Sequence, residues 1–477
     1  MIDKTAELCR KQKIIIPTIA QMKDPAKVPG AIQNRLADVG LWDLDPANLF
    51  RVTWKNEPVS RGGGFNLGNW IEFPSALTGV PARIIGLCGK YFPTGSHKVG
   101  AAFGCLVPRL VSGEVDSTRQ KFVWPSTGNF CRGGAYVSAL LGCKAVAILP
   151  EGMSSERFDW LRSIGAEIIA TPGSESNVKE IYDKCWEIRR SQPDHVILNQ
   201  FEELGNAVWH YHVTGSMIEE LCERIGGGRQ NLAAYVSATG SAGTIAAGDY
   251  LRTIGSDVKV AAVEALQCPT LLRCGFGEHR IEGIGDKHIP WIHNVRNTDV
   301  VVAVDDAHCL RLMRLFNEKI GRAFLASQNV PQETIDSLEL LGISSICNLI
   351  ASIKMARYFE LGPEDLLFTP LTDSMELYGS RLEEERTRCG EYTERDAAGD
   401  QARYLEGVAI DNMRELGYYD RKALHNLKYF TWVEQQGRTA DELHRLWQPE
   451  FWTQAFNQAA EWDRQIDDLN DRVGLLG

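Results

Sequence analysis

Hydrophobic and polar positions divide the chain into three stretches with different patterns. In the middle stretch, residues 51–382, short runs of β-branched and small apolar residues alternate with longer stretches whose apolar residues recur at helical spacing. This alternation is typical of a mainly parallel sheet whose strands alternate with helices along the chain. The middle stretch therefore predicts an α/β core.

Three transitions from a predicted strand to a turn stand out in this core. The apolar runs at 122–124, 145–149 and 233–237 each lead into a turn rich in small residues. Ligands of open α/β sheets bind just beyond the carboxyl ends of the strands. We therefore expect the chemistry of this protein in these turns.

The two flanking stretches have other patterns. Residues 1–50 carry four prolines in a polar background and predict an extended N-terminal arm; these are Pro17, Pro25, Pro29 and Pro46. Residues 383–477 are charged, aromatic and helical by pattern, and Thr439 with Glu442 predicts a capping box. The last predicted helix has a narrow apolar seam, typical of docking or pairing, at Ala459, Trp462, Ile466, Leu469 and Val473.

Composition narrows the class of protein. The 477 residues have a formal net charge of −11, and no long Lys/Arg run is present, which argues against a nucleic-acid partner. No apolar stretch is long enough to predict a membrane span. The twelve cysteines form no C-x-x-C pair, so they predict reduced thiols in a cytoplasmic protein rather than a metal site. We assign structural roles to His210 and His212 because no third ligand lies at metal spacing.

The first candidate motif is PTGSHKVG at residues 93–100, which contains Lys98. Most lysines are solvated surface charges. Here, however, small residues flank Lys98 on both sides, and they would allow a planar cofactor to approach the backbone. A desolvated lysine is the usual Schiff-base partner of an aldehyde cofactor.

The next two motifs are turns that could bind anions. STGNFCRGG at 126–134 follows a predicted strand, and its exposed amides could hold a carboxylate, although an ordinary βα turn capped by Asn129 has the same pattern. TGSAGT at 239–244 could direct backbone N–H groups at a phosphate, but it is neither a dinucleotide fingerprint nor a P-loop.

The fourth motif, LGISSIC at 341–347, precedes another helical pattern. Ser344 could simply cap that helix, which is the commoner role for such a serine.

These four motifs occur in the order and approximate spacing found in the tryptophan-synthase β-like, or fold type II, pyridoxal-phosphate enzymes. The chain resembles that family from about residue 51 to 381, and it is most similar to cysteine synthases. Four further segments carry the resemblance, at 150–157, 199–201, 282–290 and 372–378. The family implies two open, mainly parallel α/β domains with the cofactor in the cleft, the smaller one inserted at roughly 92–205.

The resemblance implies a role for each motif residue. Lys98 would hold pyridoxal 5'-phosphate as an internal aldimine and later move protons. Asn129 would bond the phenolic oxygen, and Ser344, or Ser345 if the register is off by one, would face the pyridine nitrogen. The phosphate and the substrate would be held by the remaining residues: Gly240, Ser241, Ala242, Gly243 and Thr244 for the phosphate, and Ser126, Thr127, Gly128, Phe130 and Gln200 for the substrate.

The implied reaction is β-replacement or β-elimination on an L-amino acid with a leaving group at Cβ, through an aminoacrylate. A hydroxyl beside the pyridine nitrogen makes the cofactor a weaker electron sink than a carboxylate would, which favours loss of a β-substituent. One alternative is elimination alone, as in serine/threonine dehydratases or cysteine desulfhydrases. Another is a non-catalytic interaction subunit.

Three positions depart from the family pattern. Phe130 stands where cysteine synthases have a small hydroxyl residue, so we expect a reshaped pocket and do not require O-acetylserine as the substrate. His97 is similar to the tryptophan synthase β subunit, but Ser126 stands where that enzyme has a catalytic Glu, so indole is not proposed. The resemblance also implies a homodimer or higher homo-oligomer.

Overall fold

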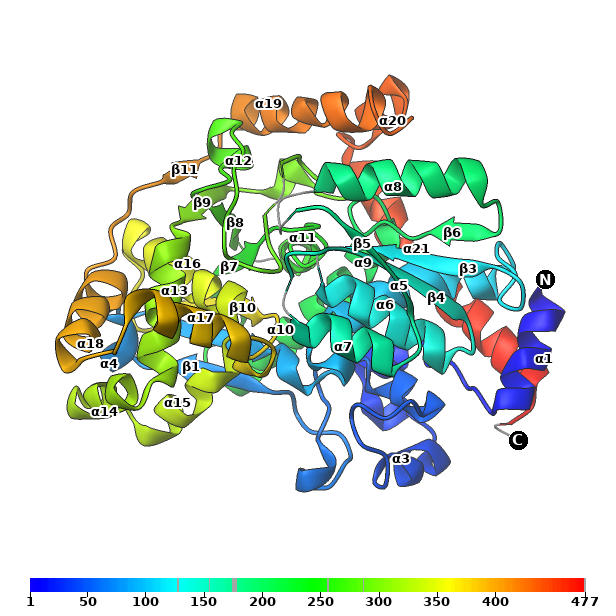
Figure 1. Cartoon of the computed structure of the whole chain (residues 1–477), viewed down its shortest axis with the longest axis horizontal. Helices are drawn as coiled ribbons and strands as arrows, with labels where there is room; N and C mark the ends of the chain where they lie inside the picture. Colours follow the sequence, from blue (N-terminus) through cyan, green and yellow to red (C-terminus); the bar gives the residue numbers. More distant parts are fainter. Residues whose placement is uncertain (127, 154, 174–177, 255–256, 286, 476–477) are drawn as a thin grey trace. The chain divides into compact units, whose positions relative to one another are not determined.

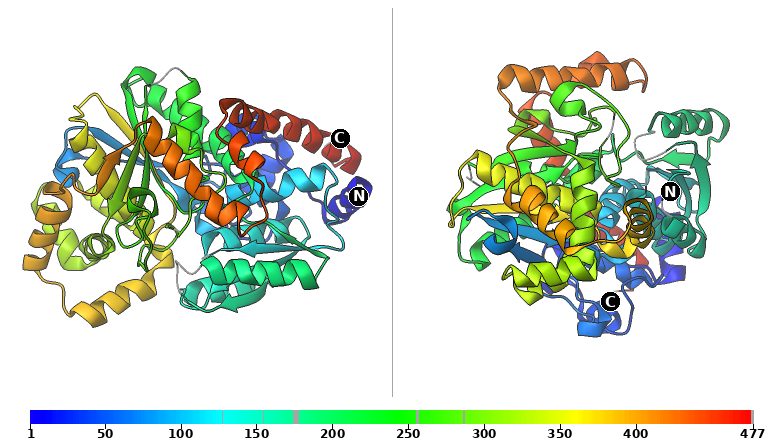
Figure 2. Two further views of the ribbon diagram at one scale, coloured as in Figure 1. Left: turned by 90° about the horizontal axis from the view of Figure 1, so that it is seen from above. Right: turned by 60° about the vertical axis from the view of Figure 1, so that its left-hand side comes forward.

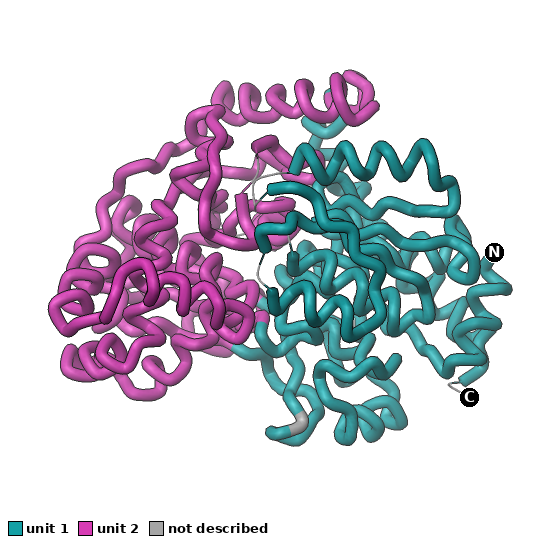
Figure 3. The backbone as a smooth tube through the Cα atoms, in the orientation of Figure 1, with its two compact units in different colours: residues 1–69, 90–217, 444–477 teal, residues 70–89, 218–443 magenta. Residues whose placement is uncertain are grey.

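The computed structural model describes residues 1–126, 128–153, 155–173, 178–254, 257–285 and 287–475. By its internal contacts the chain forms two compact units (Figure 3). Unit 1 comprises residues 1–69, 90–217 and 444–477, and unit 2 comprises residues 70–89 and 218–443. Each unit is described separately.

Unit 1 contains a four-stranded parallel sheet in the order β5-β4-β3-β6 among its described residues (Figure 1). Its strands are β3 (Lys121–Pro125), β4 (Lys144–Pro150), β5 (Glu167–Thr171) and β6 (His195–Ile197). Successive side chains along each strand point to opposite faces of the sheet. Val123 packs on α8 (Val178–Ser191), whereas Trp124 packs on α6 (Asn129–Leu140), where a Cβ on Gly134 would lie 2.0 Å from the indole.

The remaining helices of unit 1 come from both ends of the chain and from the middle. They are α1 (Ile2–Gln12), α2 (Ile19–Lys23), α3 (Gly30–Leu36), α5 (Lys98–Val111), α7 (Ser155–Ser163), α9 (Leu204–Trp209), the start of α10 (Gly215–Arg224) and α21 (Pro449–Val473). Unit 1 also contains short 3-10 turns at Pro25–Lys27, Pro46–Arg51, Val59–Arg61 and Pro93–Gly95 and a π-helix at His210–Thr214.

The N-terminal arm is helical where the prolines predicted extended chain. Pro25 and Pro46 occupy the first turn of 3-10 helices, and Pro29 is the N-cap residue of α3. Proline fits the first turn of a helix because the N–H group that it lacks would have no intrahelical partner there. The prolines therefore mark helix starts in this arm.

The seam of the last predicted helix is buried on α21, which packs against the N-terminal arm and against α5 and α9. All five seam residues from Ala459 to Val473 are buried on α21. Asn470 accepts from the N–H of Ile16 (3.0 Å) and donates to its carbonyl (2.8 Å), and Asp463 accepts the first N–H groups of α2. The two ends of the chain thus lie side by side in unit 1 (Figures 1 and 2).

Unit 2 contains a seven-stranded sheet among its described residues, in the order β1-β2-β10-β7-β8-β9-β11. Its strands are β1 (Trp70–Phe73), β2 (Arg83–Cys88), β7 (Leu232–Ala238), β8 (Lys259–Ala265), β9 (Val300–Val304), β10 (Leu366–Leu371) and β11 (Met413–Glu415). Among the described strands only the pairs β1–β2 and β11–β9 are antiparallel, so the predicted mainly parallel sheet is confirmed.

The helices of unit 2 include α16 (Ile343–Tyr358), which crosses β10, β7 and β9. The others are α4 (Ser75–Thr78), α11 (Ala246–Thr253), α12 (Thr270–Arg273), α13 (Asp306–Asn317), α14 (Lys319–Ser327), α15 (Gln332–Ser337), α17 (Gly379–Cys389), α18 (Glu394–Gln401), α19 (Tyr418–Lys428) and α20 (Ala440–Arg445), with π-helices at Ala402–Glu406 and Tyr429–Val433. Both halves of the predicted Thr439–Glu442 capping box are present at α20.

Candidate active site

Lys98 is the first residue of α5 in unit 1, and its side chain is only 8% exposed. The preceding turn has two consecutive residues with left-handed backbone, Thr94 (φ 68°) and Gly95 (φ 69°). A left-handed threonine is strained and is found mostly where the surrounding structure enforces it. The chain therefore turns sharply before it delivers Lys98 to the start of the helix.

Close backbone packing fixes the start of α5. A Cβ on Gly133 of α6 would lie 2.9 Å from the Val99 nitrogen and 3.0 Å from the Lys98 carbonyl carbon. On the α9 side, a Cβ on Gly100 would lie 2.3 Å from the Trp209 ring, and one on Gly205 only 1.9 Å from the Gly104 carbonyl oxygen. Glycine is required at these positions because two helices approach α5 closely.

A group of buried rings lies beside His97, the residue before Lys98. The His97 and His210 rings meet edge to face with centroids 4.9 Å apart. The Trp54 indole N–H donates to Thr214 Oγ1 (3.0 Å), which lies 2.9 Å from His210 Nδ1. The Thr214 hydroxyl therefore links Trp54 to His210, and whether it donates to Nδ1 or accepts from it depends on the tautomer of His210.

Both histidines are neutral at physiological pH. Burial, together with the charge of Lys98, lowers the pKa of His97 to about 3. Burial lowers the pKa of His210 well below its ordinary value, and His97 and Lys98 lower it further. His210 belongs to the π-helix at His210–Thr214, and such irregular turns are frequent at functional sites.

The substrate turn follows β3 at the predicted place. Gln200 Nε2 donates to Ser126 Oγ (3.3 Å), and Ser126 Oγ accepts the Gly128 N–H (3.1 Å), so two of the predicted carboxylate ligands lie together. Gln200 Oε1 has no hydrogen-bond partner among the described residues. A Cβ on Gly128 would lie 2.2 Å from the Arg157 guanidinium, which is fully buried against this turn. Thr127 lies outside the described residues.

Asn129 and Phe130 start α6 directly after this turn. Asn129 is 4% exposed and is the first residue of the helix, so Gly128, and not Asn129, is the N-cap residue. The Phe130 ring meets the Trp124 ring edge to face, with centroids 5.4 Å apart, and is 1% exposed. Phe130 therefore packs against the sheet as well as flanking the turn.

In unit 2 the predicted phosphate turn lies between β7 and α11. Within the described part of the chain, the N–H groups of Gly240, Ala242, Gly243 and Thr244 donate to no protein acceptor. Ala242 has φ 61°, an uncommon left-handed alanine. Unsatisfied amides followed by a helix N-terminus form a cradle that suits a phosphate.

Ser344 is the second residue of α16, whose N-cap residue is Gly342, so this serine does not cap the helix. It is fully buried, and its hydroxyl has no hydrogen-bond partner among the described residues. The neighbouring Ser345 hydroxyl lies 3.4 Å from the carbonyl of Asp373. A buried hydroxyl with no protein partner suits a heteroaromatic nitrogen, and Ser344 fits that role better than Ser345.

The phosphate turn and Ser344 belong to one hydrogen-bonded framework in unit 2. The N–H of Ala238, at the end of β7, donates to Asn348 Oδ1 (2.8 Å), which lies one helical turn after Ser344. The Asn348 amide group also donates to the Pro370 carbonyl of β10 (2.8 Å). A cofactor with a phosphate and a pyridine ring would therefore find both partners in this unit.

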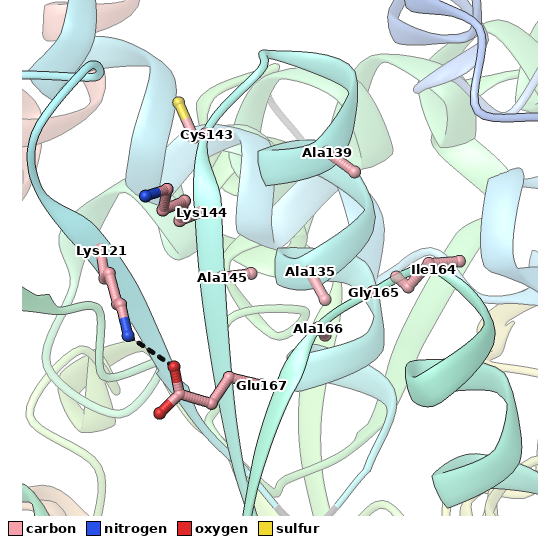
Figure 4. A pocket seen from close by; sticks show the side chains of 10 residues that line it. All are labelled: Lys121, Ala135, Ala139, Cys143, Lys144, Ala145, Ile164, Gly165, Ala166 and Glu167. Carbon is pink, nitrogen blue, oxygen red and sulfur yellow. Dashed lines mark hydrogen bonds and ion pairs between the residues drawn. The ribbon is translucent and has the colours of Figure 1, made fainter.

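A surface hollow in unit 1 lies at the opposite end of the strands from the substrate turn (Figure 4). Its volume is about 460 Å³, and it lies where β3, β4 and β5 begin. Its polar rim includes Lys121 and Glu167, which form an ion pair at 2.6 Å. This hollow does not coincide with the candidate catalytic residues.

The described helices include none that is long and apolar enough to cross a membrane. In the same part of the chain, no cluster of three or more His, Cys, Asp or Glu side chains could hold a metal ion. Ten of the twelve cysteines are buried, and all twelve are outside disulfides.

The family model described as pyridoxal-phosphate dependent enzyme matches residues 77–324, more than half of the chain. The chain belongs to this family, and its cofactor is pyridoxal phosphate. The buried Lys98, the amide cradle and the buried Ser344 hydroxyl fit this cofactor. The predicted fold class and the resemblance are confirmed.

Three similar proteins narrow the class further. Cysteine synthase B from Campylobacter jejuni is 29% identical over 297 residues, which cover 62% of this chain and 90% of that protein. A cysteine synthase from Staphylococcus aureus is 30% identical over 60% of this chain and 84% of its own length. The crystal structure of a hydrogen sulfide-producing enzyme from Fusobacterium nucleatum has a TM-score of 0.57, with 26% identity, and covers 73% of this chain and 95% of that chain.

Two buried residues have surroundings that were not predicted from the sequence. His210 was assigned a purely structural role, yet its ring contacts His97 beside the catalytic lysine candidate. Lys428 in the C-terminal extension is completely buried in unit 2. A lysine within an apolar and aromatic run, Leu427 to Phe430, was a signal in the sequence for such burial.

Proposed function

We propose that this enzyme replaces a leaving group at the β-carbon of an L-amino acid, with β-elimination as the first half of the reaction. The observation that supports this most is the deeply buried Lys98, which starts α5 directly after a strained turn. When bound, pyridoxal phosphate supplies the electron sink that stabilises negative charge at the substrate Cα.

Lys98 Nζ has two roles in this proposal. It would hold the cofactor through its aldehyde, and as a free amine it would take the proton from the substrate Cα. The adjacent His97 and His210 are neutral, so neither competes with Lys98 as a charged proton donor.

The substrate carboxylate is assigned to the turn after β3. Ser126, Gly128 and Gln200 already form a hydrogen-bonded group, and Gln200 Oε1 has no partner within the described part of the chain. Thr127 and Phe130 complete the proposed substrate-binding set. Asn129 is assigned to the phenolic oxygen, where a hydrogen bond would orient the ring.

In unit 2, the amides of residues 240–244 are assigned to the phosphate and the Ser344 hydroxyl to the pyridine nitrogen. Ser344 carries no charge, so it does not keep the pyridine nitrogen protonated as a carboxylate would. Expulsion of a β-substituent is then favoured over reactions that need a longer-lived carbanion at Cα.

Elimination alone is the second candidate function. Two similar proteins are named cysteine synthases, and the similar crystal structure is of a hydrogen sulfide-producing enzyme. Both names fit one active site whose outcome depends on whether a second nucleophile or water completes the reaction. We also propose a cytoplasmic homodimer or higher homo-oligomer.

The deciding experiment uses the purified enzyme and a panel of β-substituted L-amino acids, with and without sulfide. We expect a new amino acid when sulfide is present and keto acid with ammonia when it is absent. Lys98→Ala should abolish both products and the visible absorbance of the lysine-bound cofactor while the circular dichroism spectrum is unchanged. Full activity in Lys98→Ala would refute the proposal.

A further inference from the structure

The loop before β9 connects the phosphate turn to the C-terminal extension within unit 2. At its start, the Gly285 N–H donates to the Thr239 carbonyl (3.1 Å), and a Cβ on Gly240 would lie 3.1 Å from the Gly283 carbonyl oxygen. Residues 283–285 therefore contact Thr239 and Gly240 at the start of the phosphate turn. Further along, residues 287–298, here called the docking segment, contain only one short 3-10 turn.

Side chains of the C-terminal extension hold the docking segment. Lys428, the last residue of α19, donates to the carbonyls of Trp291 (3.0 Å) and His293 (2.7 Å). The Trp432 indole N–H donates to the carbonyl of Ile289 (2.8 Å). Three alternate carbonyls of the docking segment thus accept hydrogen bonds from two side chains more than 130 residues away, and the His293 carbonyl also accepts the N–H of Val295 (2.9 Å).

These contacts are buried and would be costly to lose. Lys428 and Trp432 are both 0% exposed. A buried carbonyl that is left without a donor keeps the full penalty of desolvation, so loss of the bonds to Ile289 and Trp291 should cost more than loss of a surface hydrogen bond. The Trp432 ring also packs near Trp291, with centroids 6.1 Å apart.

Separate contacts join α19 to the end of the loop before β9. Arg421 of α19 pairs with Asp299 (2.7 Å), whose other oxygen accepts the Val260 N–H of β8 (2.8 Å). Within the loop, Asn294 donates to Asp249 (2.6 Å) on α11, the helix that follows the phosphate turn. The extension, the docking segment and α11 therefore form one connected support.

We infer that Lys428 and Trp432 are positioning residues for the cofactor phosphate turn, acting through the docking segment, which Asn294 joins to α11 directly after that turn. The inference rests on the proposed role of residues 240–244. It assigns a task to this part of the C-terminal extension, which is to set the affinity of the enzyme for its cofactor.

The chain offers matched controls for both residues. Trp432→Phe removes the indole N–H but keeps an aromatic ring, and Trp452→Phe does the same at a buried tryptophan of the extension that donates to Leu446 (2.8 Å) instead of the docking segment. Lys428→Met is matched by Lys354→Met, a buried lysine that pairs with Asp411 (2.9 Å).

The test titrates pyridoxal phosphate into cofactor-depleted enzyme and follows the visible absorbance, then measures inhibition of this binding by inorganic phosphate. We expect Trp432→Phe to weaken the affinity for both about fivefold, the value of one net hydrogen bond. Turnover at saturating cofactor should change less than twofold. Trp452→Phe and Lys354→Met should leave both affinities unchanged.

Equal affinities in Trp432→Phe and Trp452→Phe would overturn the inference, and so would a loss of turnover at saturating cofactor with no change in affinity. If Lys428→Met does not fold, the comparison of Trp432→Phe with Trp452→Phe still tests the inference. A wild-type enzyme that binds no pyridoxal phosphate at Lys98 would refute the proposed function itself, and that outcome is distinct because it does not depend on any variant.

Discussion

The surroundings of Lys98 in unit 1 and the phosphate turn in unit 2 are supported in different ways. Around Lys98 the support is steric: glycines let two helices touch the backbone of α5, and buried rings pack against His97. Around the phosphate turn the support is a framework of hydrogen bonds, which includes Asn348, Gly285 and, further away, the C-terminal extension.

This difference matches what each region would have to do. A lysine that exchanges a covalent bond and moves a proton needs a fixed backbone and an uncharged surrounding, which close packing provides. A turn that holds a dianion must keep its own amides free for the ligand, so other groups have to fix its shape. Substitutions that add volume should therefore damage the first region most, and those that remove donors the second.

The largest effect should come from added volume beside Lys98. Gly133→Ala places a Cβ 2.9 Å from the Val99 nitrogen, so α5 and α6 must separate by a few tenths of an ångström or more. We expect turnover to fall about 100-fold, because misplacement of a reacting group is that costly, with little change in phosphate affinity. Steady-state kinetics and cofactor titration measure the two effects.

Gly399→Ala is the control for Gly133→Ala. It makes the same substitution in α18, where a Cβ would meet nothing within 4 Å. Turnover should be unchanged there. Equal turnover in Gly133→Ala and the wild type would show that packing at Gly133 does not position Lys98.

A charge in the phosphate turn should have the next largest effect. Gly243→Asp brings a carboxylate toward the amides that are assigned to the phosphate, and repulsion of about 2 kcal/mol would weaken cofactor binding about 30-fold. The measurement is the same cofactor titration, and turnover at saturating cofactor should fall much less. Gly30→Asp, at an exposed helix start, is the control. Unchanged affinity in Gly243→Asp would place the phosphate elsewhere.

Much of this architecture could be predicted from local sequence patterns. The strands at 122–124, 145–149 and 233–237 and the turns that follow them are confirmed as parts of β3, β4 and β7, because each depends on neighbouring residues only. The helical extension is confirmed as well. The prediction of an extended arm was wrong. A count of prolines does not show whether each proline lies in the first turn of a helix or prevents a helix from forming.

Contacts between distant residues could not be predicted in this way. Gly133 lies 35 positions after Lys98, and nothing local shows that its missing Cβ makes room for that lysine's backbone. The same holds for His210 beside His97 and for Lys428 on the docking segment. The roles of individual site residues stay predictions, because they require a bound cofactor to test them.

A smaller effect should appear in the pH dependence of stability. Burial lowers the pKa of Lys428 from 10.5 to about 7. Between these two values the unfolded chain binds a proton at Lys428 that the folded chain does not, so this residue makes stability rise with pH in that window. From pH 7 to 8.5 the contribution is about 1.5 kcal/mol, roughly a tenfold change in the unfolding constant.

Urea unfolding of the wild type and of Lys428→Met at pH 7 and 8.5 measures this contribution as a difference. In this difference the contributions of groups that titrate in both proteins cancel, such as those of buried cysteines whose pKa values are raised. We subtract the free energy of unfolding of the wild type from that of Lys428→Met. This difference should fall by about 1.5 kcal/mol from pH 7 to 8.5, because only the wild type becomes more stable through Lys428. A constant difference would mean that Lys428 keeps its charge in the fold through this window.

The smallest effect should come from His210→Phe. This substitution tests whether the surroundings of Lys98 depend on packing rather than on hydrogen bonds. This substitution keeps an aromatic ring against His97 and removes only the Nδ1 contact with Thr214, whose hydroxyl still accepts from Trp54. Because His210 is already neutral, the pH profile of turnover should not move, and turnover should stay within about threefold of wild type. Trp432→Phe also exchanges one ring for another, yet there the lost N–H should weaken cofactor binding. If His210→Phe instead lowered turnover 100-fold or shifted its pH profile, His210 would act through its ring nitrogens, and the support of Lys98 would depend on hydrogen bonds after all.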